Sequence, residues 1–155
     1  MWYNPGMRNN LRLGYKEGDT WIISHFRLLE FETADGFAMV DCSVVRALER
    51  TREALGKQYG CEVRILITCG VRTMADNWRL AAELGWLEDG GLVARDSRHL
   101  SKYGGIAVDV VAEYTHDGAT TRVPQDQLAA ACRNHFSYVK ANYTDGHVHA
   151  DNRVS

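Results

Sequence analysis

The sequence predicts an α+β fold, a small and mostly antiparallel sheet with helices packed around it, in a single domain of residues 1–155. Two observations support this prediction. Segments with apolar residues at helical spacing alternate with short runs of β-branched residues, in the order helix, strand, helix, strand, helix. The chain then ends in a hairpin pattern, and a hairpin brings antiparallel strands together.

The N-terminal part of the chain carries few signals of regular structure. Residues 1–20 are largely polar and contain the turn signal Asn4-Pro5-Gly6, so we expect an irregular segment there. Residues 21–31 are apolar with interspersed charges, and we expect a short strand or a docking segment. The first helix is expected at residues 43–58, where apolar residues recur at helical spacing and charged residues fill the other side.

The middle of the chain predicts a strand followed by a helix. Residues 62–68 alternate and are rich in β-branched side chains, which is typical of a strand. The second helix is expected at residues 74–84, with Thr73 as its N-cap and Gly85 at its end. Arg72 therefore lies where the strand passes into the helix, a place that often carries function. From its position alone, a surface salt bridge is the simpler role for Arg72.

The last third of the chain predicts the remaining elements. A strand is expected at residues 106–112, followed by a polar loop at residues 115–121. Pro124 is expected at the first position of the third helix, where proline is favoured. Residues 138–151 have the pattern of a hairpin with Asp145-Gly146 in its turn.

Composition narrows the class of protein. The hydrophobic fraction is 45%, the charged fraction is 25% and the net charge is −2, which is ordinary for a globular domain and gives no broad attraction to nucleic acid or to an anionic membrane. No early stretch is apolar enough for a signal peptide or a membrane span. The four cysteines form no C-x-x-C pair, so we do not expect a cysteine zinc site, and Cys69 is expected to be a small core residue.

Two polar clusters lie in the second half of the chain and predict a metal site. Ser97-Arg98-His99 precedes a glycine-containing loop and the strand that carries Asp109, and the chain closes with His147-Val148-His149-Ala150-Asp151. Two imidazoles and one carboxylate suit a catalytic zinc ion, which takes three protein ligands and leaves one position open. Asp109 lies in an apolar run, where a carboxylate is costly unless a partner such as a metal ion pairs with it. His99, Asp109 and His149 are therefore the candidate ligands of a Zn²⁺ site, and the alternative is that each is an ordinary core or loop residue whose hydrogen bonds are satisfied within the protein.

An ordered set of motifs over most of the chain, from about residue 26 to residue 153, resembles the zinc D-alanyl-D-alanine carboxypeptidase-like peptidases, a family that includes phage endolysins. Each motif alone is weak, and their order makes the set more specific. The motifs are Phe26-Arg27-Leu28-Leu29-Glu30-Phe31, the helix segment Leu48 to Gly56, Cys69-Gly70-Val71-Arg72-Thr73 with Asn77, Ser97-Arg98-His99, Gly105-Ile106-Ala107-Val108-Asp109, and His149-Ala150-Asp151 with Arg153.

The resemblance implies a zinc metallopeptidase, with His99, Asp109 and His149 as ligands and Arg72 facing the substrate carbonyl or carboxylate. The chain departs from the family pattern twice. Asp109 follows His99 by ten residues where the family has seven, an insertion that a loop tolerates. Gly146 stands where many members carry an acidic residue.

The second departure leaves two candidates for the general base, His147 and Asp145. On a strand, His147 and His149 would point to the same face, and an imidazole can both take and return a proton near neutral pH. We therefore favour His147, with Asp145 orienting it or acting in its place. Ser97 and Asp151 are expected to orient the ligand imidazoles from outside.

The function implied by the resemblance is hydrolysis of an amide bond in peptidoglycan stem peptides, as a carboxypeptidase or endopeptidase in cell-wall lysis or remodelling. The alternative is a non-catalytic module of the same fold that keeps zinc and binds the wall or serves as a phage structural part. The expected partner is a peptidoglycan peptide, with no nucleic acid and no membrane span. Without a signal peptide, the chain would reach the wall after release or delivery by another component.

Overall fold

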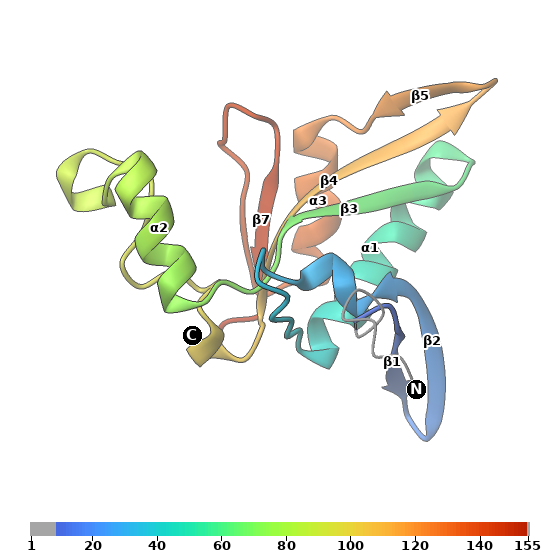
Figure 1. Cartoon of the computed structure of the whole chain (residues 1–155). Coiled ribbons are helices and arrows are strands. Elements are labelled where there is room, and N and C mark those ends of the chain that lie inside the picture. Colours follow the sequence, from blue (N-terminus) through green and yellow to red (C-terminus); the bar gives the residue numbers. More distant parts are fainter. Residues whose placement is uncertain (1–8, 155) are drawn as a thin grey trace.

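The computed structural model describes residues 9–154, and its α+β architecture confirms the predicted class (Figure 1). One antiparallel sheet has five strands, in the order β3-β4-β7-β6 with β5 paired to β4. A separate two-stranded sheet pairs β1 with β2. The strands are β1 (Arg12–Glu17), β2 (Thr20–Arg27), β3 (Val63–Cys69), β4 (Ala107–His116), β5 (Ala119–Arg122), β6 (Tyr138–Lys140) and β7 (Val148–Asp151).

One face of the larger sheet is the core of the protein. Helices α1 (Cys42–Tyr59) and α3 (Gln125–Arg133) pack on this face, and the β1–β2 hairpin packs against α1. The alternate residues of β4 and β7 that point to this face are fully buried: Val108, Val110, Val148 and Ala150. Because side chains alternate along a strand, residues 109, 149 and 151 lie on the other face, where the site forms.

Helix α1 is fixed at both ends by its own sequence. The Asp41 carboxylate accepts a hydrogen bond from the Ser43 backbone N–H at 2.9 Å, which caps the first turn. Gly60 ends the helix in the left-handed region with a φ of 67°, a conformation that glycine adopts without strain. Val44, Leu48 and Leu55 of α1 are buried in the core, as their spacing predicts.

Helix α2 (Met74–Leu84) stands apart from this core. The Thr73 hydroxyl accepts from the Asp76 N–H at 3.1 Å and Gly85 ends the helix, as predicted. No residue of α2 belongs to the main core among the residues described, and Figure 1 shows the helix projecting to the side of the sheet away from α1. The buried Asn77 side chain anchors it, donating from Nδ2 to the Ala94 carbonyl at 3.0 Å.

The sequence prediction was wrong at two hairpins. Residues 12–20, expected to be irregular, form β1 and the start of β2, joined at Gly18-Asp19; residues 1–8 lie outside the described residues. Residues 115–121, expected to be a polar loop, form the end of β4 and most of β5 around Asp117-Gly118. The second error arises because β5 is exposed and polar and lacks the apolar alternation that marks a half-buried strand. In β1 the buried Tyr15 and the partly buried Leu13 do alternate with polar or small residues, but two such positions are a weak signal for a strand.

Two smaller differences concern the ends of elements. Pro124 is the N-cap of α3 and not its first residue. The terminal hairpin has only a short β6 and a longer connecting loop, and His147 precedes β7. Within residues 9–154, no helix combines the length and apolar character needed to cross a membrane.

Candidate metal centre and groove

A single row of side chains crosses four strands of the sheet. In the strand register, Cys69 of β3 pairs with Asp109 of β4, Asp109 pairs with His149 of β7, and His149 pairs with Lys140 of β6. Residues directly opposite each other in antiparallel strands present their side chains on the same face, with Cβ atoms about 5 Å apart. The register therefore gathers a thiol, a carboxylate, an imidazole and an ammonium group in one line.

His99 joins this row from the loop before β4. A short parallel bridge holds its segment, in which the Arg72 N–H donates to the His99 carbonyl at 2.7 Å. The His99 ring is buried, and its Nδ1 donates to the Gly70 carbonyl at 2.7 Å. This contact turns Nε2 toward Asp109, and the distance from Nε2 to Asp109 Oδ1 is 3.1 Å.

Three donor atoms converge at this point. His149 Nδ1 lies 3.0 Å from Asp109 Oδ1 and 3.1 Å from His99 Nε2, which closes a triangle with the His99–Asp109 contact. The structure thus brings together the three residues that the sequence proposed as ligands. Each comes from a different segment, namely the loop before β4, β4 and β7.

The outer nitrogen of each ring is held by a second partner. His99 Nδ1 meets the Gly70 carbonyl, and His149 Nε2 lies 2.7 Å from Asp151 Oδ2. Asp151 is fully buried and accepts two hydrogen bonds from the Arg153 guanidinium, at 2.8 and 2.6 Å. The carbonyl or carboxylate beside each outer nitrogen accepts a hydrogen bond, so the one proton of a neutral ring is on that outer nitrogen. The inner nitrogen of each neutral ring is therefore left with a lone pair.

This arrangement fits a cation. Two nitrogen lone pairs and a carboxylate oxygen that face one another at 3.0–3.1 Å repel unless a positive charge lies among them. The pKa values of His99 and Asp109 without a metal also show that this place favours a positive charge. Burial lowers the pKa of His99, but the hydrogen bonds that its ring makes to Asp109 and Cys69 outweigh burial and raise it to about 10. Burial raises the pKa of Asp109, but His149 and His99 outweigh it and hold that pKa below its ordinary value.

Cys69 also belongs to this centre, so its expected role as a core residue is wrong. It is only partly buried, and Cys69, His99 and Asp109 form a group that could hold a metal ion. Its Sγ lies 3.7 Å from His99 Nδ1 and 3.6 Å from an Arg72 terminal nitrogen. The sequence did contain a signal that Cys69 lies near the site. Cys69 directly precedes Gly70, whose carbonyl contacts the His99 ring, and it lies three residues before Arg72, which lines the groove.

The centre opens into a groove with a volume of about 900 Å³. Apolar side chains of α2 and the loop after it form part of the lining, including Leu84 and Leu92, both exposed. Arg72 also lines the groove, and its NH1 donates to Asn77 Oδ1 at 3.0 Å. Arg72 Nε is the single buried side-chain nitrogen or oxygen among residues 9–154 that has no hydrogen-bond partner.

A second imidazole lines the groove beside the centre. His147 Nε2 lies 3.8 Å from Asp109 Oδ2, and His147 Nδ1 lies 2.5 Å from Asp145 Oδ1. The Tyr143 ring stacks on the His147 ring with 3.9 Å between centroids. Gln125 of α3 donates to the carbonyls of Tyr143 and His147, which ties this loop to the core. The structure therefore brings both candidate bases to the groove, with Asp145 behind His147.

Ser97 does not orient an imidazole, so that expectation is wrong. Its hydroxyl accepts a hydrogen bond from the His99 backbone N–H at 3.2 Å. The ring nitrogen that we expected Ser97 to hold meets the Gly70 carbonyl instead. Ser97 stabilises the turn that carries His99, since short hydroxyl side chains bond the backbone two residues on.

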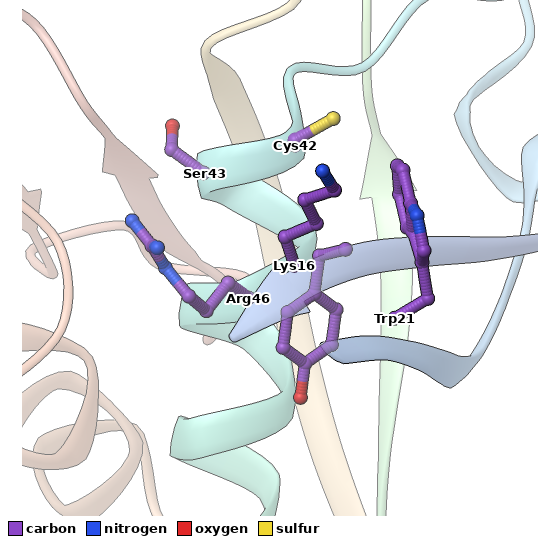
Figure 2. Close-up of a pocket in the computed structure, with 6 residues that line it drawn as sticks. Lys16, Trp21, Cys42, Ser43 and Arg46 are labelled. Atoms are coloured by element: carbon purple, nitrogen blue, oxygen red, sulfur yellow. The ribbon is translucent and has the colours of Figure 1, made fainter. Parts of the chain in front are cut away.

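A smaller pocket of about 270 Å³ lies between the β1–β2 hairpin and the start of α1 (Figure 2). Figure 2 shows Ser43 and Arg46 on the helix, with Trp21 standing across from Lys16. Its lining contains no histidine and no carboxylate, and Cys42 is its one metal-binding side chain among the residues described. Of these two pockets, the larger groove is the one lined by histidine and carboxylate side chains.

Comparisons with protein families, curated proteins and solved structures gave no match for this chain.

Proposed function

We propose that this chain is a zinc-dependent hydrolase that cleaves an amide bond in peptidoglycan stem peptides. The observation that carries the proposal is the triangle of donor atoms from His99, Asp109 and His149 at the floor of the groove. These three residues would hold the ion. A bound zinc ion supplies a Lewis acid that polarises a carbonyl and lowers the pKa of water. The ordered motifs that resemble the peptidase family supply the substrate class.

His147 is suited to move the proton in this reaction. Its Nδ1 is occupied by Asp145, so its Nε2 is free to face the groove on the side of Asp109. Hydrolysis adds water to the amide carbon, breaks the C–N bond and needs a proton on the leaving amine. Nε2 takes the proton from water and returns it to the amine, while Asp145 fixes the tautomer and stabilises the imidazolium.

Arg72 is suited to bind the substrate. Its NH1 is fixed by Asn77, and its buried Nε has no hydrogen-bond partner within residues 9–154. A guanidinium next to the centre also stabilises negative charge that develops on the carbonyl oxygen, which is worth about 3 kcal/mol for one good donor.

The direct test is digestion of defined muropeptides by purified protein loaded with zinc, with product masses read by mass spectrometry. We expect fragments that differ from the substrate by cleavage of one amide bond, and no fragments after a chelator has removed the metal. His147→Ala should retain the metal and lose most turnover. Intact muropeptides after prolonged incubation with the zinc-loaded protein would refute the proposal.

Cys69 favours a second candidate, a non-catalytic module with a structural metal ion. A thiolate added to the three ligands would close the coordination shell, as in structural zinc sites. Burial raises the pKa of the Cys69 thiol, but His99 and Arg72 outweigh burial and hold it below its ordinary value. Against this candidate, the Sγ atom contacts His99 Nδ1 and not the inner Nε2.

The hydrolase and the structural module predict different effects of Cys69→Ser on metal affinity and on the absorption spectrum of a bound metal ion. Cobalt(II) in place of zinc gives an intense near-ultraviolet band when a thiolate binds it. For the hydrolase, we expect no such band in the wild type and an unchanged metal affinity in Cys69→Ser. A thiolate band that disappears in Cys69→Ser, together with uncleaved muropeptides, would favour the structural module.

A further inference from the structure

Lys140 lies in the row of site residues and no function has yet been assigned to it. It pairs with His149 across β6 and β7, so the two side chains share the groove face of the sheet. The Lys140 side chain is exposed and lines the groove. An ammonium group therefore lies one strand away from a proposed metal ligand.

Four arginine and lysine side chains line the groove, and they differ in what they contact. Arg153 is paired with Asp151 at 2.6 Å and Arg98 with Asp96 at 3.4 Å, while Arg72 is held by Asn77. Lys140 has no ion-pair partner within residues 9–154, and its Nζ lies 5.2 Å from the centre of the Tyr143 ring.

The carboxylates of the groove do not compensate this charge. Asp96, Asp109 and Asp145 are the acidic residues in its lining, and each already has a partner. Asp96 pairs with Lys102 at 2.7 Å, Asp145 with His147, and Asp109 lies in the metal centre. A divalent ion at the centre would raise the positive charge of the groove further. Such a groove attracts anionic groups, and complementary charge in a substrate gives specificity.

We propose that Lys140 binds a carboxylate of the substrate and selects peptides that carry a free carboxylate over their amidated counterparts. This inference rests on the proposed hydrolysis of stem peptides, and it adds the feature of the peptide that the groove recognises. The β6 strand fixes the position of the Lys140 backbone against β7, and the ammonium group lies over the Tyr143 ring. Lys140 is therefore a specificity residue and takes no part in the proton transfer assigned to His147.

The test uses three synthetic stem pentapeptides, L-Ala-γ-D-Glu-L-Lys-D-Ala-D-Ala, the same peptide with the D-Glu α-carboxylate amidated, and the same peptide with its C-terminal carboxylate amidated. The kcat/KM for each is measured with zinc-loaded wild type, Lys140→Ala and Lys140→Arg. Lys57→Ala is the matched control, because it removes one lysine from α1 outside the groove lining. Circular dichroism and zinc content establish that each variant is folded and loaded.

We expect the kcat/KM of the wild type to be roughly five- to tenfold higher for the parent peptide than for one of the two amides. This factor lies between the effect of an exposed ion pair and that of a charge-assisted hydrogen bond. Lys140→Ala should abolish that preference by slowing cleavage of the parent, and Lys140→Arg should keep it. A preference that Lys140→Ala leaves unchanged overturns this inference alone, as does an equal loss on all three peptides. If the wild type cleaves none of the three, the proposed function fails, and this inference fails with it.

Discussion

The Nε2 atom of His99 lies 3.1 Å from the Nδ1 atom of His149. Two neutral imidazoles cannot share a hydrogen bond through these atoms, because the one proton of each ring is on its outer nitrogen, which donates it to another acceptor. Such a contact needs a cation between the rings, either a metal ion or an added proton. The two rings and Asp109 therefore enclose a place for one positive charge, which a protonated ring or a bound metal ion would supply.

Metal content is the first prediction. Wild type purified without chelator should contain about one zinc ion per chain, and Asp109→Ala or His149→Ala should contain far less, because each removes one corner of the donor triangle. Elemental analysis measures the content. His116→Ala is the control, since His116 is exposed at the end of β4. Normal zinc in Asp109→Ala would remove Asp109 from the centre.

The second prediction concerns the contacts behind His149. Asp151→Asn should weaken zinc affinity by about 10–100-fold, because the amide cannot reproduce a carboxylate held by Arg153 on one side and His149 on the other. Competition with a fluorescent chelator measures the affinity.

Asp117→Asn is the matched control for this change. It is the same substitution at an exposed turn residue with a φ of 50°, a conformation that asparagine tolerates. Equal zinc affinity in the two variants would show that Asp151 has no effect on the metal centre.

The sequence was sufficient to predict the helices, the antiparallel class and the candidate ligands. Those features depend on local patterns: the spacing of apolar residues in α1, the Thr73 cap of α2 and the ordered motifs around His99, Asp109 and His149. These signals lie within short stretches of chain, so a single sequence reveals them.

What the sequence did not reveal depends on strand register. Cys69 and Lys140 enter the site because β3, β4, β7 and β6 align in one row, and register is set by packing between strands far apart in the chain. Ser97 was assigned to the wrong group for a similar reason. The Gly70 carbonyl takes its place, and only the folded chain shows which backbone group lies beside the His99 ring.

The third prediction links backbone packing to the site. A Cβ atom at Gly70 would lie 2.9 Å from Cα and 3.0 Å from the carbonyl oxygen of the buried Phe31. Gly70→Ala must therefore shift the backbone, at a cost of about 1–3 kcal/mol in the free energy of unfolding. Because the Gly70 carbonyl holds the His99 ring, zinc affinity should fall as well. Chemical denaturation and metal competition measure the two effects, and a loss of stability with full zinc affinity would contradict the link.

The fourth prediction is that zinc binding releases protons. Ligand imidazoles must be neutral to bind a metal ion. In the metal-free site the pKa of His99 is raised from 6.5 to about 10, so its ring carries an added proton between these two pH values. Zinc must displace that proton, and apparent affinity should rise with pH across this window. Calorimetry at pH 7.5 in buffers of different ionisation enthalpy measures the release, and a binding heat that does not depend on the buffer would contradict it.

The last prediction separates the two candidates for the general base. His147 Nε2 lies on the side of Asp109, whereas Asp145 is largely exposed and reaches the centre only through the His147 ring. His147→Ala should therefore lower kcat by about 10²–10⁴-fold, the range for loss of a general acid–base group, and Asp145→Asn should lower it less. Zinc content should be normal in both variants, because neither residue belongs to the donor triangle. An inactive Asp145→Asn beside an active His147→Ala would reverse the two roles, and loss of zinc from His147→Ala would make His147 a ligand in place of His149.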